Sequence, residues 1–186
     1  MKSRLNILIV IILEFILIAQ CLPAPVQAQT QHAITYDSRA RFERILVEDG
    51  LPNATVLSVL QDQDGFMWFA TADGLARYDG TDFTIFRHDD QRNSLSNNNT
   101  FCLIQSRDGL IWIGTDPGGL NVYDPQTGQF SVYKNDPENE NSLPNDSVWS
   151  LMEDRDGNIW IGTRNGLSRL DRATGTFHNY LPDPEN

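Results

Sequence analysis

Cysteine and basic residues are both scarce in this chain. Of its 186 residues two are cysteines, and 14 lysines and arginines stand against 25 aspartates and glutamates. The resulting formal net charge of −11 argues against nucleic acid and anionic membrane surfaces as partners, because phosphate binding needs clustered basic side chains. With 40% hydrophobic and 10% aromatic residues, the chain still has enough apolar side chains to form a packed domain.

The first 28 residues are typical of a secretory signal peptide, which would be helical. A short positive region precedes an apolar run over residues 5–19, and Val26 and Ala28 place small side chains at a cleavage site. The run is short for a membrane span and contains Glu14, so we favour cleavage after Ala28 over an uncleaved anchor. The chain is therefore expected to be exported, to the periplasm or the cell exterior.

Export with cleavage excludes an internal disulfide bond. Cys102 would be the one cysteine left, so the domain must be stabilised by its core. By the repeat described next, Ser58 and Ser150 align with Cys102. Three small side chains at one position predict a packing role rather than a reactive thiol.

Three segments of similar sequence make up most of the remaining chain. They begin at Leu51, Leu95 and Leu143, and each carries a tryptophan 17 residues later. Successive tryptophans are 44 and 48 residues apart (68 to 112, and 112 to 160), which is the length of a propeller blade. The structural anchors that recur in register are Trp68, Trp112, Trp160, Gly65, Gly109, Gly157, Asp64, Asp108 and Asp156.

Each segment is predicted to form four short strands. The first is a dense apolar run, typical of a strand buried on both faces. Turns that contain glycine separate it from the strand that carries the tryptophan, and that strand from the next two. The predicted strands are 56–61, 67–71, 75–78 and 83–87, then 100–105, 111–115, 120–123 and 129–133, then 148–153, 158–163, 167–170 and 176–180.

The pattern predicts an all-β fold, a partial β-propeller of three four-stranded antiparallel blades. One twisted sheet cannot bury both faces alone, whereas blades stacked around an axis bury them against one another. The expected blades are 51–94, 95–142 and 143–186, after a flexible leader at 29–41 and an orphan outer strand at 42–46. Because three blades are too few to close a ring, we expect an N-terminal fragment of a longer product that self-associates in isolation.

The repeat resembles the two-component regulator propeller repeat. The resemblance rests on Leu-Pro-Asn-Asp-Ser-Val at 143–148, on Asp-Arg-Asp-Gly-Asn-Ile-Trp-Ile-Gly-Thr at 154–163, and on the counterpart of the latter at 62–71. Ala70 departs from the glycine of the other two units, and Ser106 from their aspartate.

The resemblance implies the periplasmic sensor region of a hybrid histidine kinase-type receptor. In that family a signal peptide precedes one or two propellers, and a small β-sandwich, an inner-membrane helix and a cytoplasmic output domain follow. Ligands are often breakdown products of polysaccharides, so an oligosaccharide is the expected ligand class. The remaining blades and the membrane parts of the receptor would be further partners. A secreted propeller enzyme acting on carbohydrate (glycoside hydrolase or lyase) and a protein-interaction scaffold remain as alternatives.

No catalytic, cofactor-binding or metal-binding residue is predicted. The Asp-Gly pairs lack the spacing of a calcium loop, and a hairpin turn explains them. His32, His88 and His178 are not spaced as metal ligands, and the last two are expected to be solvated. The acidic residues fall mostly in turns and linkers, where a converging glycosidase pair is not expected.

Trp149 is the one residue predicted as a candidate ligand contact, since the other polar stretch that could reach a sugar, at 97–99, is better explained by a turn. Its counterparts are Leu57 and Phe101, so packing between blades is the favoured interpretation. Residues of the innermost strand can also line the central channel of a propeller, where an indole ring can stack on a sugar.

Overall fold

The computed structural model describes residues 43–90 and 93–183, and the predicted signal peptide and leader lie outside them. Across these ranges the chain forms twelve β-strands and one 3₁₀ turn, η1 (Val47–Asp49). None of their helical segments is long and apolar enough to cross a membrane.

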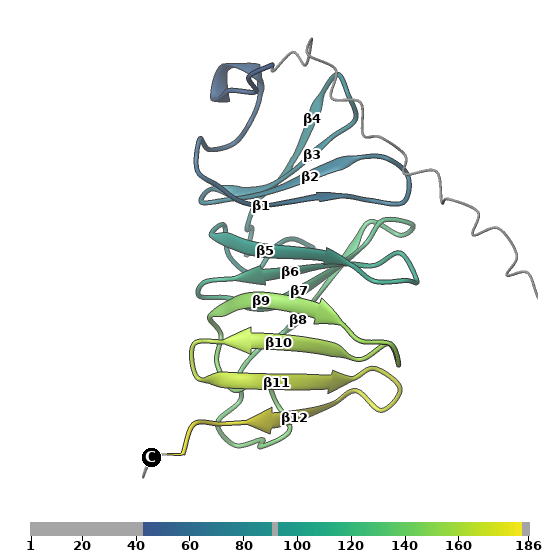
Figure 1. The fold of residues 1–186 in the computed structure, drawn as a ribbon. Helices are drawn as coiled ribbons and strands as arrows, with labels where there is room; N and C mark the ends of the chain where they lie inside the picture. Colours follow the sequence, from purple (N-terminus) through teal and green to yellow (C-terminus); the bar gives the residue numbers. More distant parts are fainter. Residues whose placement is uncertain (1–42, 91–92, 184–186) are drawn as a thin grey trace, which may run out of the picture. The chain divides into compact units, whose positions relative to one another are not determined.

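The strands form three four-stranded antiparallel sheets, one for each repeat (Figure 1). Neighbours in the chain are neighbours in each sheet. Blade 1 contains β1 (Val56–Gln61), β2 (Met67–Thr71), β3 (Gly74–Tyr78) and β4 (Phe83–Phe86). Blade 2 contains β5 (Thr100–Gln105), β6 (Ile111–Thr115), β7 (Gly119–Asp124) and β8 (Gln129–Tyr133). Blade 3 contains β9 (Val148–Glu153), β10 (Ile159–Thr163), β11 (Gly166–Asp171) and β12 (Thr176–Tyr180). The predicted partial propeller of three blades is confirmed.

A tight turn that requires glycine joins the first two strands of every blade. Gly65, Gly109 and Gly157 have φ values of 91°, 92° and 87°, which residues with a side chain rarely adopt. The amide nitrogen of each glycine donates to the carbonyl oxygen three residues earlier, at 2.8 to 3.2 Å. The recurring glycines therefore close the hairpins that set the strand register.

The blades pack face to face, and an apolar cluster fills each of two seams. The innermost strands follow one another, with β1 beside β5 and β5 beside β9. The first seam, between blades 1 and 2, contains Trp68, Ala70, Leu75, Leu95, Leu103, Ile111, Ile113 and Tyr123. The second seam, between blades 2 and 3, contains Trp112, Leu120, Val122, Leu143, Val148, Ile159, Ile161, Leu170 and Phe177. Burial of these side chains is the main stabilising contribution to the fold.

Two expectations need correction. The described part of the predicted orphan strand, residues 43–46, forms no strand and leads into η1. A strand forms where its backbone groups pair with a neighbouring edge, and these residues join no ladder of the described sheets. The first strand of blade 1 is also not buried on both faces, since Val56, Leu57 and Val59 are exposed. Blade 1 packs against another described blade on one face only.

Candidate functional site

One hydrogen bond holds the anchor tryptophan in all three blades. The indole Nε1 donates to an oxygen of the side chain six residues earlier. The pairs are Trp68 and Asp62 (2.7 Å), Trp112 and Ser106 (2.9 Å), and Trp160 and Asp154 (2.9 Å). Sequence reasoning found the tryptophans but missed their acceptors, although an oxygen-bearing residue six positions upstream is itself a repeated signal.

The acceptor aspartates also organise the turns that follow them. Asp154 Oδ1 accepts from the backbone nitrogens of Asp156 and Asn158, both at 2.9 Å, and the equivalent Asp62 does the same in blade 1. Hydrogen bonds from the side chains of Asn158 and Trp160 lower the pKa of Asp154 to about 2. These carboxylate oxygens are engaged by donors of their own blade. Nowhere in residues 43–90 and 93–183 do three or more His, Cys, Asp or Glu side chains gather as a metal-binding group.

The second aspartate of the turn contributes differently in each blade. Asp64 and Asp156 donate their backbone N–H groups within the turn. The side chain of Asp108 accepts from Ser106 Oγ (2.6 Å) and from Arg172 of blade 3. Partial burial raises the pKa of Asp108, but the bonds from Arg172 and Ser106 outweigh it and hold that pKa below its usual value. Asp108 therefore links two blades.

Cys102 lies in the second seam, where its Sγ is 3.9 Å from the carbonyl oxygen of Val148. Burial raises the pKa of its thiol to about 12. Because the thiolate is the reactive form, this side chain is inert at neutral pH and acts as a small packing group.

The structure places a carboxylate beside Trp149. The residue is 44% exposed, and its indole Nε1 donates to Asp116 Oδ2 at 3.0 Å. Asp116 belongs to the turn between β6 and β7 of blade 2, and its Oδ1 accepts from Ser147 Oγ at 2.6 Å. Bonds from Ser147 and Trp149, together with the nearby Arg164, hold the pKa of Asp116 below its usual value. Trp149 and Asp116 thus form an ionised, partly exposed cluster that bridges blades 2 and 3.

The two members of this cluster depart from the repeat. Trp149 stands where blades 1 and 2 have Leu57 and Phe101, and Asp116 stands where blade 1 has Ala72. The three blades have the same fold, so residues that differ between them at equivalent positions are not required for that fold. Such residues are candidates for a functional role. The sequence could have pointed to Asp116, because an aspartate is unusual at this position of the turn. Its contact with Trp149 could not be predicted, because that contact depends on how two blades meet.

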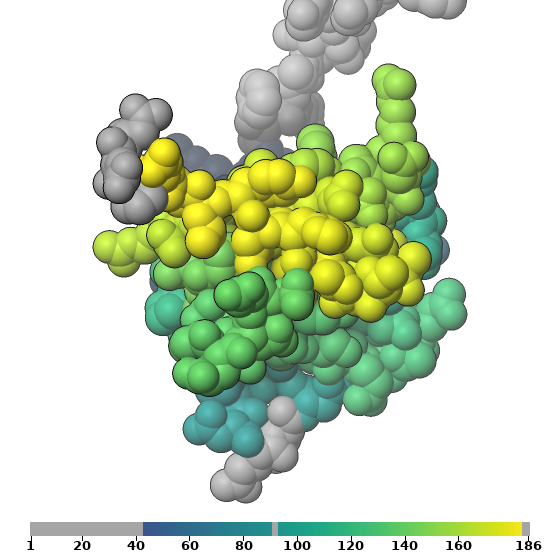
Figure 2. Space-filling model, turned by 90° about the horizontal axis from the view of Figure 1, so that it is seen from below, coloured from purple at the N-terminus to yellow at the C-terminus, as the bar shows by residue number. Residues whose placement is uncertain are grey.

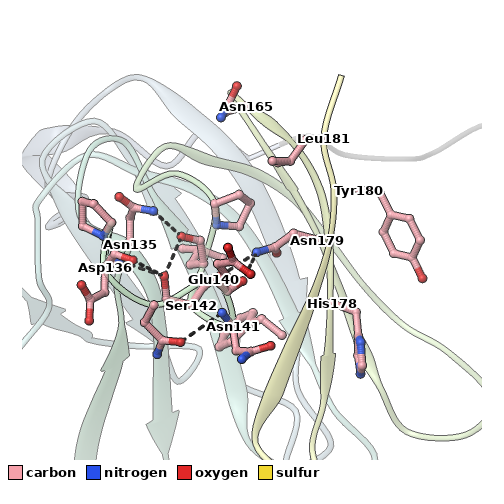
Figure 3. A pocket seen from close by; sticks show the side chains of 15 residues that line it. Asn135, Asp136, Glu140, Asn141, Ser142, Asn165, His178, Asn179, Tyr180 and Leu181 are labelled. Carbon is pink, nitrogen blue, oxygen red and sulfur yellow. Dashed lines mark hydrogen bonds between the residues drawn. The ribbon is translucent and has the colours of Figure 1, made fainter. Parts of the chain in front are cut away.

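A pocket of about 660 Å³ lies between the linker before blade 3 and β12 (Figure 3). Asn179 on β12 holds the linker there, since its Nδ2 donates to the carbonyl oxygens of Glu140 (3.1 Å) and Ser142 (2.9 Å). Figure 2 shows the linker in green beside the yellow C-terminal strand. A smaller counterpart of about 300 Å³ lies at the linker before blade 2. Recurrence at both linkers indicates a feature of the repeat rather than a separate ligand site.

The two linkers are closed by the same set of hydrogen bonds. Ser142 Oγ donates to the carbonyl oxygen of Asp136 (3.0 Å), as Ser94 Oγ does to that of Asp89 (2.9 Å). His88, which was expected to be solvated, has its Nδ1 2.6 Å from the carbonyl oxygen of Leu95. This histidine is exposed, as expected, and it also contributes to the linker structure.

Comparisons with known proteins place the repeats in a family. The two component regulator propeller family matches residues 50–73, 94–116 and 142–165. These ranges begin within one residue of the three leucines that open the segments and include the anchor tryptophans. No curated protein matches the chain.

Solved structures similar to this chain include two extracellular domains from B. thetaiotaomicron. One is assigned to a hybrid two component system, with 36% identity, a TM-score of 0.71, and coverage of 75% of this chain and 20% of that one. The other is assigned to a one component system, with 27% identity, a TM-score of 0.57, and coverage of 68% and 19%. The chain spans about a fifth of their length.

A streptogramin B lyase structure is also similar, at 24% identity with a TM-score of 0.53, covering 72% of this chain and 43% of that one. At this identity the likeness extends to the fold alone.

Proposed function

Because the chain belongs to the two component regulator propeller family, we propose that it is a ligand-binding sensory segment of a two-component signalling receptor. The support is its similarity to the extracellular domain of a hybrid two component system, at 36% identity over 75% of the chain. We propose further that residues 1–28 direct export and that other receptor parts anchor the segment in the inner membrane. A mature chain that begins at Gln29, measured by mass spectrometry of the exported protein, would support the first part.

We propose that the ligand contacts the cluster formed by Trp149 and Asp116. The single observation that carries this proposal is the partly exposed indole ring whose N–H is already bound by Asp116 Oδ2. An aromatic face beside a charged acceptor suits an oligosaccharide, because the ring stacks on sugar C–H groups while the carboxylate accepts from hydroxyls. The cluster bridges two blades, so bound ligand would bias their packing and pass that bias to the receptor.

Binding without chemistry is the favoured role of this cluster. Hydrolysis of a glycoside requires one carboxyl group with a raised pKa to act as the acid. Among the described residues, every carboxyl group with a resolved shift has a lowered pKa. Asp116 itself stays ionised at neutral pH, which suits an acceptor better than a proton donor.

Calorimetric titration with a panel of oligosaccharides tests this proposal. We expect at least one to bind, and Trp149→Leu, which introduces the residue of blade 1, to weaken its binding on the order of tenfold or more. The matched control is Trp160→Phe, an aromatic change outside the cluster, which should leave the affinity unchanged. Equal affinity of the wild type and Trp149→Leu, or cleavage of the bound sugar, would contradict the proposal.

A further inference from the structure

A groove opens at the outer part of the second seam, between blades 2 and 3. It has a volume of about 360 Å³, and its walls are formed mainly by β7 and β8 of blade 2 and by the turn after β11 of blade 3. Pockets that bind small molecules begin at about 300 Å³. Both walls belong to described blades that are neighbours in the chain, so the groove does not depend on what precedes blade 1 or follows blade 3.

The floor of the groove is apolar and partly aromatic. Trp112, Val122 and Leu170 are buried beneath it. Tyr133 stacks on Trp112, with ring centroids 6.4 Å apart and an interplanar angle of 8°. An apolar floor that contains stacked rings suits a ring of a ligand, because aromatic groups bury a large apolar area and prefer stacked or tilted contacts.

The groove is open because the second seam has smaller side chains than the first. At three equivalent positions the first seam has Phe66, Arg77 and Tyr123, and the second has Leu110, Val122 and Leu170. In the first seam, the guanidinium group of Arg77 lies over the rings of Phe66 (4.7 Å) and Trp68 (5.8 Å). The ring of Tyr123 packs against Trp68 at 5.6 Å. These larger side chains occupy the space that the second seam leaves open.

The rim of the groove carries a negative charge that no basic side chain compensates among the described residues. Arg172 is paired with Asp108, so its own charge is already balanced. Asp124 accepts from Thr127 Oγ1 and from the nitrogen of Gln126, both at 2.8 Å and both within its own turn. These bonds hold the pKa of Asp124 below its usual value, so its carboxylate is ionised at neutral pH. Each carboxylate oxygen can still accept from a further donor.

We infer that this groove binds a small aromatic amine, a molecule that combines an aromatic ring with a cationic ammonium group. The ring would lie on the apolar floor, and the ammonium group would donate to the carboxylate of Asp124. The formal net charge of −11 favours the approach of a cation. The inference adds a second site to the proposed sensory role. The turns that line the groove lie at the end of the blades opposite to the β6–β7 turn, which carries Asp116.

Three probes that share a phenol ring and differ in charge test the inference. They are tyramine, which is cationic, 4-ethylphenol, which is neutral, and 4-hydroxyphenylacetate, which is anionic. In calorimetric titrations of the full chain we expect saturable binding of tyramine, binding of 4-ethylphenol weaker on the order of tenfold, and no detectable binding of 4-hydroxyphenylacetate. Absence of tyramine binding, or equal affinity for the three probes, would overturn the inference.

The role of the carboxylate is tested by Asp124→Asn, which removes the charge and keeps an oxygen that can accept within the turn. Tyramine binding should weaken on the order of tenfold, whereas the affinity for 4-ethylphenol should stay the same. The matched control is Asp79→Asn, the equivalent change in the turn of blade 1, where Arg77 lies over the floor. Equal weakening by both variants would show a general effect of net charge and would refute a site at Asp124.

The place of the ring is tested by Leu170→Tyr, which introduces the residue of the first seam and fills the groove. We expect it to abolish the binding of tyramine and of 4-ethylphenol, while cooperative thermal unfolding shows that the variant folds. Trp149→Leu separates the groove from the cluster formed by Trp149 and Asp116, which also combines a ring with a carboxylate, and it should leave tyramine binding unchanged. Tyramine binding that persists in Leu170→Tyr, or that is lost in Trp149→Leu, would contradict the inference.

Discussion

Strands β6 and β10 have the same sequence, Ile-Trp-Ile-Gly-Thr, but different surroundings. All five residues of β6 are buried, whereas in β10 only the two isoleucines and the threonine are. The difference arises because, among the described residues, blade 2 lies between two blades and blade 3 packs on one. Identical residues thus form the same strand with the same side-chain directions, and the neighbouring blade decides which of them are buried.

The largest expected effect tests this difference on the tryptophans. Trp112 is 2% exposed and Trp160 is half-buried. Trp112→Ala should lower the free energy of unfolding by about 3–5 kcal/mol, because it removes a large buried side chain, and Trp160→Ala should lower it by clearly less. Urea unfolding at a low protein concentration measures both. Equal losses of unfolding free energy would mean that the face of blade 3 that carries Trp160 is as well packed as a seam.

A smaller effect is expected at the glycine that follows each of these tryptophans by two residues, Gly114 in blade 2 and Gly162 in blade 3. An added Cβ at Gly114 would lie 2.8 Å from the backbone oxygen of Val148, which cannot move freely. At Gly162 it would first meet the hydroxyl group of Ser150, which can rotate away. We expect Gly114→Ala to cost about 1–3 kcal/mol and Gly162→Ala less than about 1 kcal/mol, as measured by thermal unfolding. A larger loss of stability for Gly162→Ala than for Gly114→Ala would contradict this difference between the two blades.

The smallest effect concerns acid stability, where blade 3 has Asp154 and blade 2 has Ser106. The pKa of Asp154 is lowered from 3.8 to about 2 by bonds from Asn158 and Trp160, so folding favours its ionised form. Its contribution to stability is present above the unfolded pKa and is lost as the pH falls toward the folded value. Asp154→Ser should therefore flatten the loss of stability over this pH range, as measured by urea midpoints. Ser106→Asp serves as the reciprocal variant and should steepen it.

The strands could be predicted from the sequence because each strand lies within one repeat. Alternating or dense apolar residues and glycine turns are local signals, so the predicted ends differ from the observed ones by about one residue, as at Gly74. The predicted orphan strand was wrong because strand formation depends on a partner edge. The exposure of β1 was missed because burial depends on a neighbouring blade.

The candidate site was predictable only in part. Trp149 departs from its counterparts in the other repeats, which a sequence comparison detects. Its partner Asp116 is 33 residues away in another blade, and no local pattern links the two residues. The hydrogen-bond acceptor of each anchor tryptophan could have been predicted from the sequence, because it recurs at a constant separation of six residues.

One linker covers part of the outer edge of blade 2. An outer strand offers an unpaired row of backbone groups to which a foreign strand can add. Asn93 of the first linker accepts from the nitrogen of Phe130 and donates to the carbonyl oxygen of Gly128, so it occupies the margin of β8. On β12, Asn179 ties down the second linker. The linker before blade 2 therefore occupies backbone groups at the margin of β8, which leaves fewer of them open to templated addition by a foreign strand.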